Sequence, residues 1–433
     1  MGGLLFGFDI GIIAGAGPFL LRQFHLSDLG LGWAYSALLF GCIVGSAVAG
    51  RASDLYGRKK VLVWSGVLFA ATSIATGLAP GFTGFIAARF FGGIAVGAVS
   101  LVSPMYVSEV SPPSLRGRMG ALYQLSIVFG AVVSYAINYG LRNAGADNWR
   151  WMFITGVVPS ILFFALMVFA PETPRFLFKS GKRDESFRLL ERIGGKEAAK
   201  FQITEIAASL EIKQGTWRNL FQPGIRRAVI IGFILSILVQ ASGINTIVDY
   251  APAIFQSAGW KINAALLSTL LLGGIDLLFC LVSFAIIDRE GRRPVYITGS
   301  LGMMVALAGL VWTITINRFH GTLVLTLIIV FLAFFQACIG PVYWTLVPEI
   351  FPNRIRGTAM VVPVLTQWVV NALVVLFFPL AFNKLGKADT FGLLAVMCLL
   401  QAIFTWGYVP ETKGVPLEEI EAFWCPPAPA SRV

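Results

Sequence analysis

The sequence predicts an all-α membrane protein of twelve transmembrane helices, built as two six-helix parallel repeats with a small cytoplasmic helical linker. Three observations lead to this prediction. Of 433 residues, 57% are hydrophobic and only 13% are charged, whereas a soluble domain carries about 25% charged residues. The apolar residues form stretches long enough to cross a bilayer, and short polar motifs recur at a nearly constant offset. This composition excludes a soluble enzyme, a disordered regulator and a disulfide-stapled secreted domain.

The spans are the first elements that the sequence defines. A spanning helix needs about 20 apolar residues, and strand-like alternation is absent, which disfavours a β-barrel. Six stretches precede a long polar segment and six follow it. The twelve predicted spans are 1–22, 30–50, 60–79, 82–107, 119–141, 150–170, 227–256, 264–287, 294–316, 322–347, 358–383 and 388–409.

These spans divide the chain into four parts. We expect an N-terminal six-helix bundle at 1–170, a cytoplasmic linker with short helices at 171–226, a C-terminal six-helix bundle at 227–409 and a cytoplasmic tail at 410–433. The first span starts at Met1 without a lead-in. We therefore expect the natural first helix to begin several residues upstream.

The basic residues predict the orientation. Of the 33 Lys and Arg residues, 25 fall in the segments that lie inside if the N-terminus is cytoplasmic, seven fall in outside loops, and Arg89 lies within a span. Cytoplasmic loops carry the excess of positive charge. The net charge of +11 is therefore a topology signal and not a nucleic-acid footprint. We expect both termini in the cytoplasm and the protein in the plasma membrane.

No cofactor, metal site or enzymatic activity is predicted. Four of the five cysteines, Cys42, Cys280, Cys338 and Cys398, lie in apolar spans, and Cys425 lies in the tail. Their spacing fits neither a metal site nor a disulfide framework. The two histidines fall in predicted outside loops, and no nucleophile–base pair is visible.

An internal repeat relates the two halves. Three motif pairs recur at offsets of 234, 240 and 239 residues. They are Gly57-Arg58-Lys59-Lys60 with Gly291-Arg292-Arg293-Pro294, Glu109 and Arg116-Gly117 with Glu349 and Arg356-Gly357, and Pro171-Glu172-Thr173 with Pro410-Glu411-Thr412. Six crossings bring the chain back to the same side, so the repeats are parallel.

The repeated charges suggest a cytoplasmic gate. Exposed ion pairs are worth about 0–1 kcal/mol each, so several together could hold a seam closed and still open readily. One predicted cluster consists of Asp54, Arg58, Glu109 and Arg116. Its counterpart in the second half consists of Asp288, Arg292, Glu349 and Arg356.

These motifs make the chain resemble the sugar porters of the major facilitator superfamily, which include bacterial sugar–proton symporters and animal glucose facilitators. The resemblance covers essentially the whole chain. Besides the repeated motifs it rests on Phe6-Gly7-Phe8-Asp9, Arg89, Pro104-Met105-Tyr106-Val107-Ser108-Glu109, Trp149-Arg150-Trp151-Met152, Pro174-Arg175, Gln240, Ser242-Gly243-Ile244-Asn245 and Lys413-Gly414. It implies the major facilitator fold, alternating access, a monosaccharide or polyol at the midplane, and small cytoplasmic helices at 182–214.

Asp9 and Arg89 are the predicted proton-coupling residues. Ionisable groups within a span are costly and functional by default. The resemblance supports this pair, because proton-coupled sugar porters carry an acid and an arginine at the matching places. A movement that separates the two would let the acid take up a proton. A static ion pair between spans 1 and 4 is the alternative.

The predicted substrate-binding residues offer amides and aromatic faces. Amides both donate to and accept from hydroxyls, and ring faces suit the C–H patches of a sugar. The candidates that the matching motifs indicate are Gln124, Gln240, Asn245, Tyr250, Trp344 and Trp368, and the weaker candidates are Gln367 and Asn371, which flank Trp368. Ser242-Gly243 predicts a break within span 7 that borders the pathway.

Three positions depart from the family pattern. Val239 stands where a second glutamine is usual, Asp249-Tyr250 stands where paired tyrosines are usual, and Asp276 stands where many members have an asparagine. We add Asp249 and Asp276 to the substrate-binding candidates, because a carboxylate accepts strong hydrogen bonds from hydroxyls. They could instead be protonated structural groups, or alter the coupling or the substrate.

The expected function is proton-coupled sugar or polyol symport through the bilayer by a monomer. A facilitative uniporter, a proton antiporter for a non-sugar (cationic) solute and a sugar sensor are the alternatives. The tail ends about twenty residues past Pro410-Glu411-Thr412, which disfavours the sensor, because such proteins usually have long cytoplasmic extensions.

Overall fold

The computed structural model describes residues 1–112, 115–211, 220–222, 224–351 and 355–413, without the side chains of 116–117, 209–211, 284–289 and 356. Within these residues, twelve helical segments are long and apolar enough to cross a membrane, and no strand is found. They match the twelve predicted spans closely. The tail beyond Lys413, with Cys425 and the proline-rich end, lies outside the described residues.

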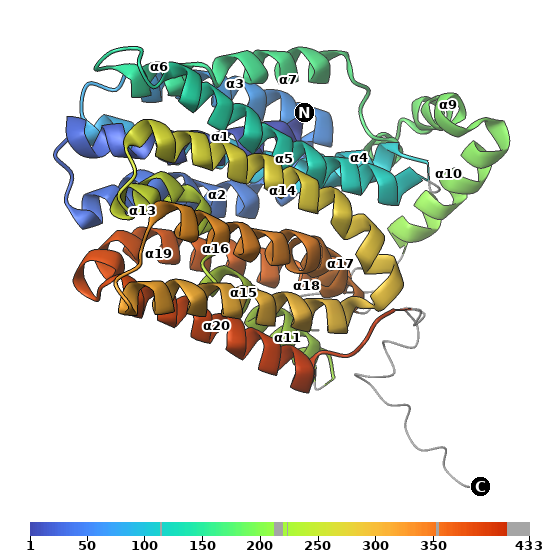
Figure 1. Cartoon of the computed structure of the whole chain (residues 1–433). Coiled ribbons are helices and arrows are strands. Elements are labelled where there is room, and N and C mark those ends of the chain that lie inside the picture. Colours follow the sequence, from blue (N-terminus) through green and yellow to red (C-terminus); the bar gives the residue numbers. More distant parts are fainter. Residues whose placement is uncertain (113–114, 212–219, 223, 352–354, 414–433) are drawn as a thin grey trace, which may run out of the picture. The chain divides into compact units, whose positions relative to one another are not determined.

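Two compact units divide the chain, Met1–Lys213 and Gln214–Val433 (Figure 1). In the first unit, α6 and α7 together form the sixth span, which was predicted as one helix. Three short helices follow, and α8 contacts both α4 and α9. The helices of this unit are α1 (Gly2–Gln23), α2 (Asp28–Tyr56), α3 (Arg58–Gly77), α4 (Phe82–Val110), α5 (Arg116–Leu141), α6 (Asn148–Ile154), α7 (Val157–Phe169), α8 (Pro174–Lys179), α9 (Arg183–Gly194) and α10 (Lys196–Glu211).

A row of glycines brings α1 against α5. Gly3, Gly7, Gly11 and Gly15 recur every fourth residue and so share one helix face. A Cβ atom built on Gly7 would lie 1.8 Å from the Ile127 carbonyl oxygen. Small residues at this spacing let membrane helices approach to backbone contact. The two helices therefore meet main chain to main chain.

A second glycine seam joins α2 to α4. Gly41 on α2 faces Gly93 on α4, and four residues further along each helix Gly45 meets the Ile94 backbone and Gly97 meets the Cys42 backbone. A Cβ atom on Gly41 would lie 2.0 Å from the Phe90 carbonyl oxygen. Inside a bilayer the hydrophobic effect does not drive helices together, so close van der Waals packing at such glycine seams holds them in contact.

The described residues of the second unit also hold six candidate spans, and three of them are interrupted. Its elements are α11 (Ile225–Ala241), α12 (Ile244–Asp249), α13 (Ala251–Ser257), α14 (Ile262–Glu290), α15 (Arg292–Thr315), α16 (Gly321–Phe334), the π-helix η3 (Phe335–Ile339), α17 (Gly340–Glu349), α18 (Arg356–Ala359), α19 (Val361–Lys384) and α20 (Lys387–Tyr408).

The predicted break in span 7 is confirmed. Helix α11 ends at Ala241, Gly243 has a φ of +81°, and α12 starts at Ile244. Only glycine adopts this left-handed conformation without strain. The Leu394 side chain would also lie 2.6 Å from a Cβ atom at this position. This break separates α11 from α12, and a second boundary at Tyr250 separates α12 from α13.

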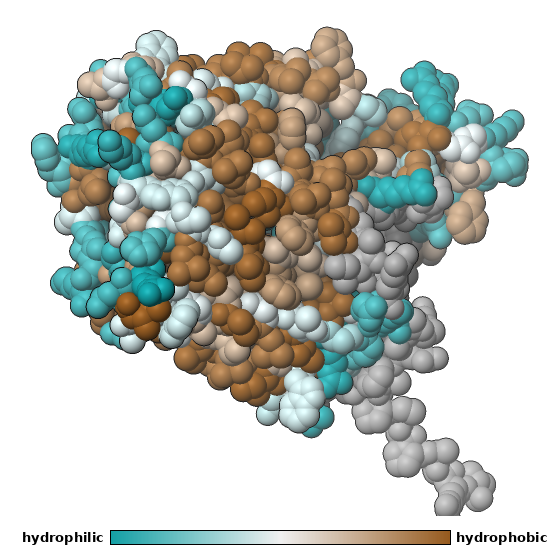
Figure 2. All heavy atoms as spheres, viewed as in Figure 1, coloured by the Kyte–Doolittle hydropathy of each residue, from teal (hydrophilic) through white to brown (hydrophobic). Residues whose placement is uncertain are grey.

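The surface of each unit suits lipid. Large apolar side chains such as Phe129, Trp312 and Leu399 are exposed. Figure 2 shows hydrophobic residues along the helices and hydrophilic residues gathered toward helix ends and on α9 and α10. This distribution is typical of helices whose solvent is a bilayer.

Candidate functional site

A buried ion pair lies inside the first unit. The Arg89 Nη1 atom on α4 donates to Asp9 Oδ1 on α1 at 2.7 Å. Asp9 is 6% exposed and Arg89 is 2% exposed. The structure thus brings the two predicted coupling residues into direct contact. The Arg89 guanidinium also lies 5.3 Å from the centre of the Phe153 ring, an attractive cation–π arrangement.

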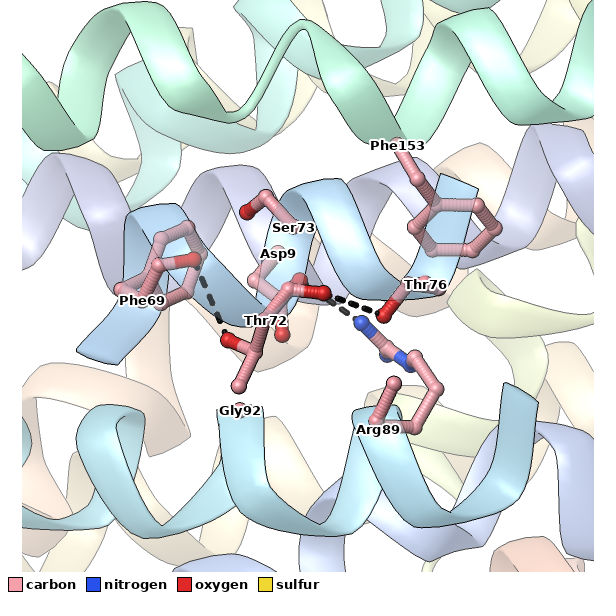
Figure 3. A pocket seen from close by; sticks show the side chains of 9 residues that line it. Asp9, Phe69, Thr72, Ser73, Thr76, Arg89, Gly92 and Phe153 are labelled. Atoms are coloured by element: carbon pink, nitrogen blue, oxygen red, sulfur yellow. Dashed lines mark hydrogen bonds and ion pairs between the residues drawn. The ribbon is translucent and has the colours of Figure 1, made fainter. Parts of the chain in front are cut away.

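A small cavity borders this pair (Figure 3). Its walls come from four helices of the first unit, namely α1, α3, α4 and α6. Three hydroxyl residues of α3, which sequence reasoning did not select, contribute to the wall. The lining residues are Asp9, Phe69, Thr72, Ser73, Thr76, Ala88, Arg89, Gly92 and Phe153.

Two amides meet at the break in span 7. The Asn245 Nδ2 atom donates to Gln240 Oε1 at 2.9 Å. Both side chains are partly buried. The hydrogen bond crosses the irregular turn at Ser242 and Gly243, so it fixes the two amides relative to each other. The remaining amide groups are suited to a ligand rich in hydroxyls.

Asp276 on α14 has a partner that the sequence analysis missed. Gln336 Nε2 donates to Asp276 Oδ2 at 3.2 Å. Gln336 lies in the π-helix η3 and is 3% exposed. Single-turn π segments inside α-helices occur frequently at functional sites. A lone glutamine in an apolar span was the available signal.

The other substrate-binding candidates have varied surroundings. Tyr250 is 2% exposed, stacks on Phe378 with 5.1 Å between ring centres, and donates its hydroxyl to the Val375 carbonyl at 3.0 Å. Asp249 and Asn371 are buried, whereas Trp344 is exposed, and Gln124, Gln367 and Trp368 lie between these extremes. The tyrosine hydroxyl is thus engaged within the second unit. Gln124 belongs to α5 of the first unit.

The predicted cytoplasmic charges of the first unit form a cluster around Arg58. Its Nη2 atom lies 3.0 Å from Asp54 Oδ1 and 3.2 Å from Glu109 Oε1. Arg58 Nη1 also donates to the Ser53 carbonyl at 3.1 Å. Three of the four predicted members therefore meet, while the side chain of Arg116 lies outside the described residues.

In the second unit, Arg292 Nε lies 3.5 Å from Glu349 Oε2. The Thr412 hydroxyl donates to the same carboxylate oxygen at 2.5 Å. The side chains of Asp288 and Arg356 lie outside the described residues. The two units thus share an arginine–glutamate pair at matching motif positions.

The repeated Pro-Glu-Thr motifs have a role that sequence reasoning missed, because each glutamate caps a helix. Glu172 Oε1 accepts from the backbone N–H groups of Arg58 and Lys59, both at 3.1 Å. Glu411 accepts from those of Arg292 and Arg293, both at 3.0 Å. A carboxylate at a helix N-terminus satisfies free N–H groups and complements the helix dipole. The 239-residue repeat of the motif was the signal.

Glu411 should stabilise the protein in a pH-dependent way. Burial raises its pKa, but backbone N–H donors of Lys413, Arg292, Arg293 and Thr412 outweigh burial, so the pKa lies below its ordinary value. A lowered pKa stabilises the fold above the ordinary pKa, and this stabilisation is lost as the pH falls through the lowered value. Relative to wild type, Glu411→Gln should lose about 1 kcal/mol at neutral pH, a typical loss for a helix cap.

The measurement is the melting midpoint of the detergent-solubilised variants across the acidic range. The gap between wild type and Glu411→Gln should narrow toward low pH. Glu197→Gln is the matched control, because Glu197 is exposed and pairs only with Lys200 at i+3 among described residues. A gap that is constant with pH would contradict the capping role of the ionised carboxylate.

Two units with six candidate spans each among the described residues, the same charged motifs in both and a buried ion pair in one define a secondary transporter with the major facilitator fold. Three comparisons with known proteins agree with this class. The chain belongs to the "Sugar (and other) transporter" family, whose sequence profile matches residues 1–424.

Relatives and solved structures agree over nearly the whole chain. The arabinose-proton symporter of Bacillus subtilis is 35% identical over 431 residues, which cover 98% of this chain and 93% of that protein. The D-xylose-proton symporter of Escherichia coli is 34% identical over 464 residues, covering 98% and 94%. The structure of the xylose transporter XylE from E. coli in an inward-open conformation has a TM-score of 0.86 at 33% identity, covering 98% of this chain and 97% of that one. The chain is a multi-pass integral membrane protein of a transporter family.

Proposed function

We propose that this protein carries a monosaccharide or polyol together with a proton across the plasma membrane by alternating access, as a monomer with both termini in the cytoplasm. The single observation that carries the coupling is the buried contact between Asp9 and Arg89. The two relatives described above are named proton symporters of pentoses, which supports the same substrate class here.

The ion pair can serve as a proton-operated latch. While Asp9 is ionised, it holds Arg89 across α1 and α4, because separating two buried charges leaves each without compensation. Once Asp9 binds a proton, the carboxyl is neutral and the attraction falls to that of an ordinary hydrogen bond. The two helices can then move apart. Release of the proton restores the pair and resets the cycle.

The driving force is sufficient for accumulation. One charge that moves through 100 mV releases about 2.3 kcal/mol. At one proton per sugar, this energy corresponds to a sugar gradient of roughly 50-fold. A protein without such coupling could only equalise the two sugar concentrations.

We assign the sugar contacts chiefly to polar residues of the second unit. Gln240 and Asn245 form one amide pair, and Asp276 with Gln336 forms an acid–amide pair. Both pairs lie at irregular segments, the break after α11 and the π-helix η3. Irregular backbone is tolerated at membrane depth where protein or a wet cavity surrounds it. In this assignment, Asp276 accepts a hydrogen bond from a sugar hydroxyl.

The change Asp276→Asn should therefore weaken sugar binding. The amide keeps the shape and the contact with Gln336 but loses the charged acceptor, which costs about 1 kcal/mol and raises KM roughly fivefold. The maximal rate and the dependence on the proton gradient should stay unchanged. Asp389→Asn, a change to an exposed acid in the first turn of α20, is the control. Loss of the gradient dependence instead would assign Asp276 to proton coupling.

Uptake into proteoliposomes tests the proposed function. Labelled xylose, arabinose, glucose, galactose and myo-inositol are each supplied with and without an inward proton gradient. Accumulation above equilibrium that requires the gradient would establish symport and identify the substrate. Entry that is blind to the gradient would make the protein a sugar uniporter.

A second candidate function follows from two acids in the second unit. Asp249 is 5% exposed and Asp276 contacts a neutral amide, so their charges suit a cationic solute. Failure of every sugar to enter, together with proton-driven movement of a labelled organic cation, would favour an antiporter for such a solute.

A further inference from the structure

The Asp9–Arg89 pair leaves hydrogen-bonding capacity unused. Asp9 Oδ2, Arg89 Nε and Arg89 Nη2 are buried and have no partner among the described residues. A buried polar atom without a partner costs about 1–3 kcal/mol. Three such atoms on one ion pair are therefore expected to meet a further polar group.

The cavity beside the pair has the size and the chemistry for that group. The centre of a water-sized sphere can occupy a volume of about 10 Å³ inside it. This is close to the space that one water molecule needs. Figure 3 shows Thr72 and Thr76 of α3 and the Arg89 guanidinium around this space. A bound water requires two to four polar partners, and this wall provides them.

The α3 hydroxyls present acceptors to the cavity. Thr76 Oγ1 donates to the Thr72 carbonyl at 2.7 Å, and Thr72 Oγ1 donates to the Leu68 carbonyl at 2.9 Å. Because each hydroxyl hydrogen is engaged within the helix, each oxygen keeps its capacity to accept. The wall therefore favours a donor such as water or the arginine.

Aromatic rings close part of the same wall against solvent. Phe153 lines the cavity and packs edge-on against Phe85 and Trp149, with 5.4 Å and 6.5 Å between ring centres. Phe85 and Trp149 are fully buried. On this side, aromatic side chains and not open solvent therefore border the cavity next to Asp9.

We propose that one water molecule bound in this cavity, between Asp9, Arg89 and the hydroxyls of Thr72 and Thr76, is the immediate proton donor and acceptor for Asp9. This inference rests on the proposed symport. A hydronium formed at this position passes one proton to Asp9 Oδ2. An O–H bond breaks on the hydronium and one forms on the carboxyl, which leaves neutral water and a neutral acid. The reverse transfer releases the proton.

The same site serves Arg89 once Asp9 is neutral. The guanidinium then lacks its counter-charge but remains buried, where an unpaired charge is costly. The water and the two threonine oxygens supply acceptors for its unused N–H groups. Thr72 and Thr76 are therefore positioning residues, because they hold the water and the arginine and do not themselves take the proton.

The change Gly92→Ala tests the water without removing a hydroxyl. Gly92 lines the cavity, and a Cβ atom there would lie 3.2 Å from Thr72 Oγ1 and 3.6 Å from Thr72 Cβ. The added methyl takes the room of the water and clashes with no backbone atom. We expect the initial rate of sugar uptake driven by a proton gradient to fall about tenfold or more, as when a positioned proton-transfer group is lost. Equilibrium exchange of labelled sugar should stay within about twofold of wild type, since it needs no net proton transfer.

A second variant probes the hydroxyl itself. Thr76→Val keeps the branched shape and removes the acceptor. Like Gly92→Ala, it should lower proton-driven uptake while equilibrium exchange stays close to wild type. Thr76→Ser restores the hydroxyl and should restore driven uptake. Ser65→Ala is the matched control, because Ser65 is a buried hydroxyl on α3 that bonds the Val61 carbonyl at 2.8 Å and lies outside the cavity wall.

The outcomes separate the two claims. Wild-type protein that shows no proton-driven uptake overturns the symport and the relay together. If wild type shows proton-driven uptake, and Gly92→Ala and Thr76→Val retain as much of it as the control Ser65→Ala, the water relay alone is overturned. Equal losses of uptake and exchange in both variants would also overturn it, because they would indicate damage to the fold. Selective loss of driven uptake, with rescue by Thr76→Ser, supports the relay.

Discussion

Replacing Asp9 with asparagine should abolish proton-driven sugar accumulation while leaving sugar exchange across the membrane. The Asp9 carboxylate is the one group on α1 that contacts Arg89 by an ion pair in the described part of the first unit. Asparagine keeps an oxygen that accepts from Arg89 but cannot bind the transported proton. The steady-state ratio of internal to external sugar should fall from tens-fold to about one, because sugar movement is then no longer coupled to proton movement down its gradient.

The measurement is accumulation in proteoliposomes under an imposed proton gradient, with counterflow of labelled sugar as the companion assay. Asp147→Asn is the matched control. Asp147 also pairs with an arginine, Arg150, at 3.0 Å, but its side chain is 61% exposed and the pair spans a single helical turn. An Asp9→Asn protein that still accumulates sugar would show that the ion pair is structural and that another acid carries the proton.

The change Gly7→Ala should prevent correct packing of the first unit. A Cβ atom at this position would lie 1.8 Å from the oxygen and 2.7 Å from the carbon of the Ile127 carbonyl. Both atoms belong to the backbone of α5, so no side-chain rotation relieves the clash and the helices must separate. Overpacking a well-packed interior costs about 1–3 kcal/mol and occasionally more. Because the obstacle is the backbone of α5, we expect Gly7→Ala to lower the free energy of unfolding by about 3 kcal/mol or more.

Thermal denaturation of the purified variants, followed by size-exclusion chromatography, measures this effect. The midpoint of Gly7→Ala should fall by on the order of 5–10 °C. Gly120→Ala and Gly140→Ala are the controls, because both glycines lie on α5 and a Cβ atom there would meet nothing within 4 Å. A Gly7→Ala protein as stable as these two would show that α1 and α5 lie further apart than described.

The fold could be predicted from sequence because its signals are local. Stretches of apolar residues define spans by length alone, and the repeat offset defines the two halves. The break at Gly243 was also visible, since a Ser-Gly pair interrupts an apolar run. The π-helix at Phe335–Ile339 was not, because its lone glutamine, Gln336, marks a polar residue in an apolar span but gives no sign of a change in helix type.

The candidate site was predicted in part for the same reason. Charged residues in apolar spans stand out, so Asp9 and Arg89 could be paired before their distance was known. The threonines of α3 could not be selected, because hydroxyls are common in membrane helices and only the fold brings Thr72 and Thr76 to the same cavity as Arg89. The motif glutamates were noticed for their repetition, yet their backbone partners, 114 residues away for Glu172 and 119 for Glu411, depend on tertiary structure.

The charged motifs contain two kinds of contact, glutamate caps and arginine ion pairs, which should respond differently to ionic strength. Mobile ions screen charge pairs near the surface over about 8 Å at physiological salt, and the Arg58–Asp54 pair has a half-exposed aspartate. The caps of Glu172 and Glu411 instead consist of short hydrogen bonds to main-chain N–H groups, which salt affects less. Added salt should therefore loosen the Arg58–Asp54 pair while each unit keeps its helix N-termini anchored. A change in salt concentration could therefore weaken the proposed gate without disrupting the fold of either unit.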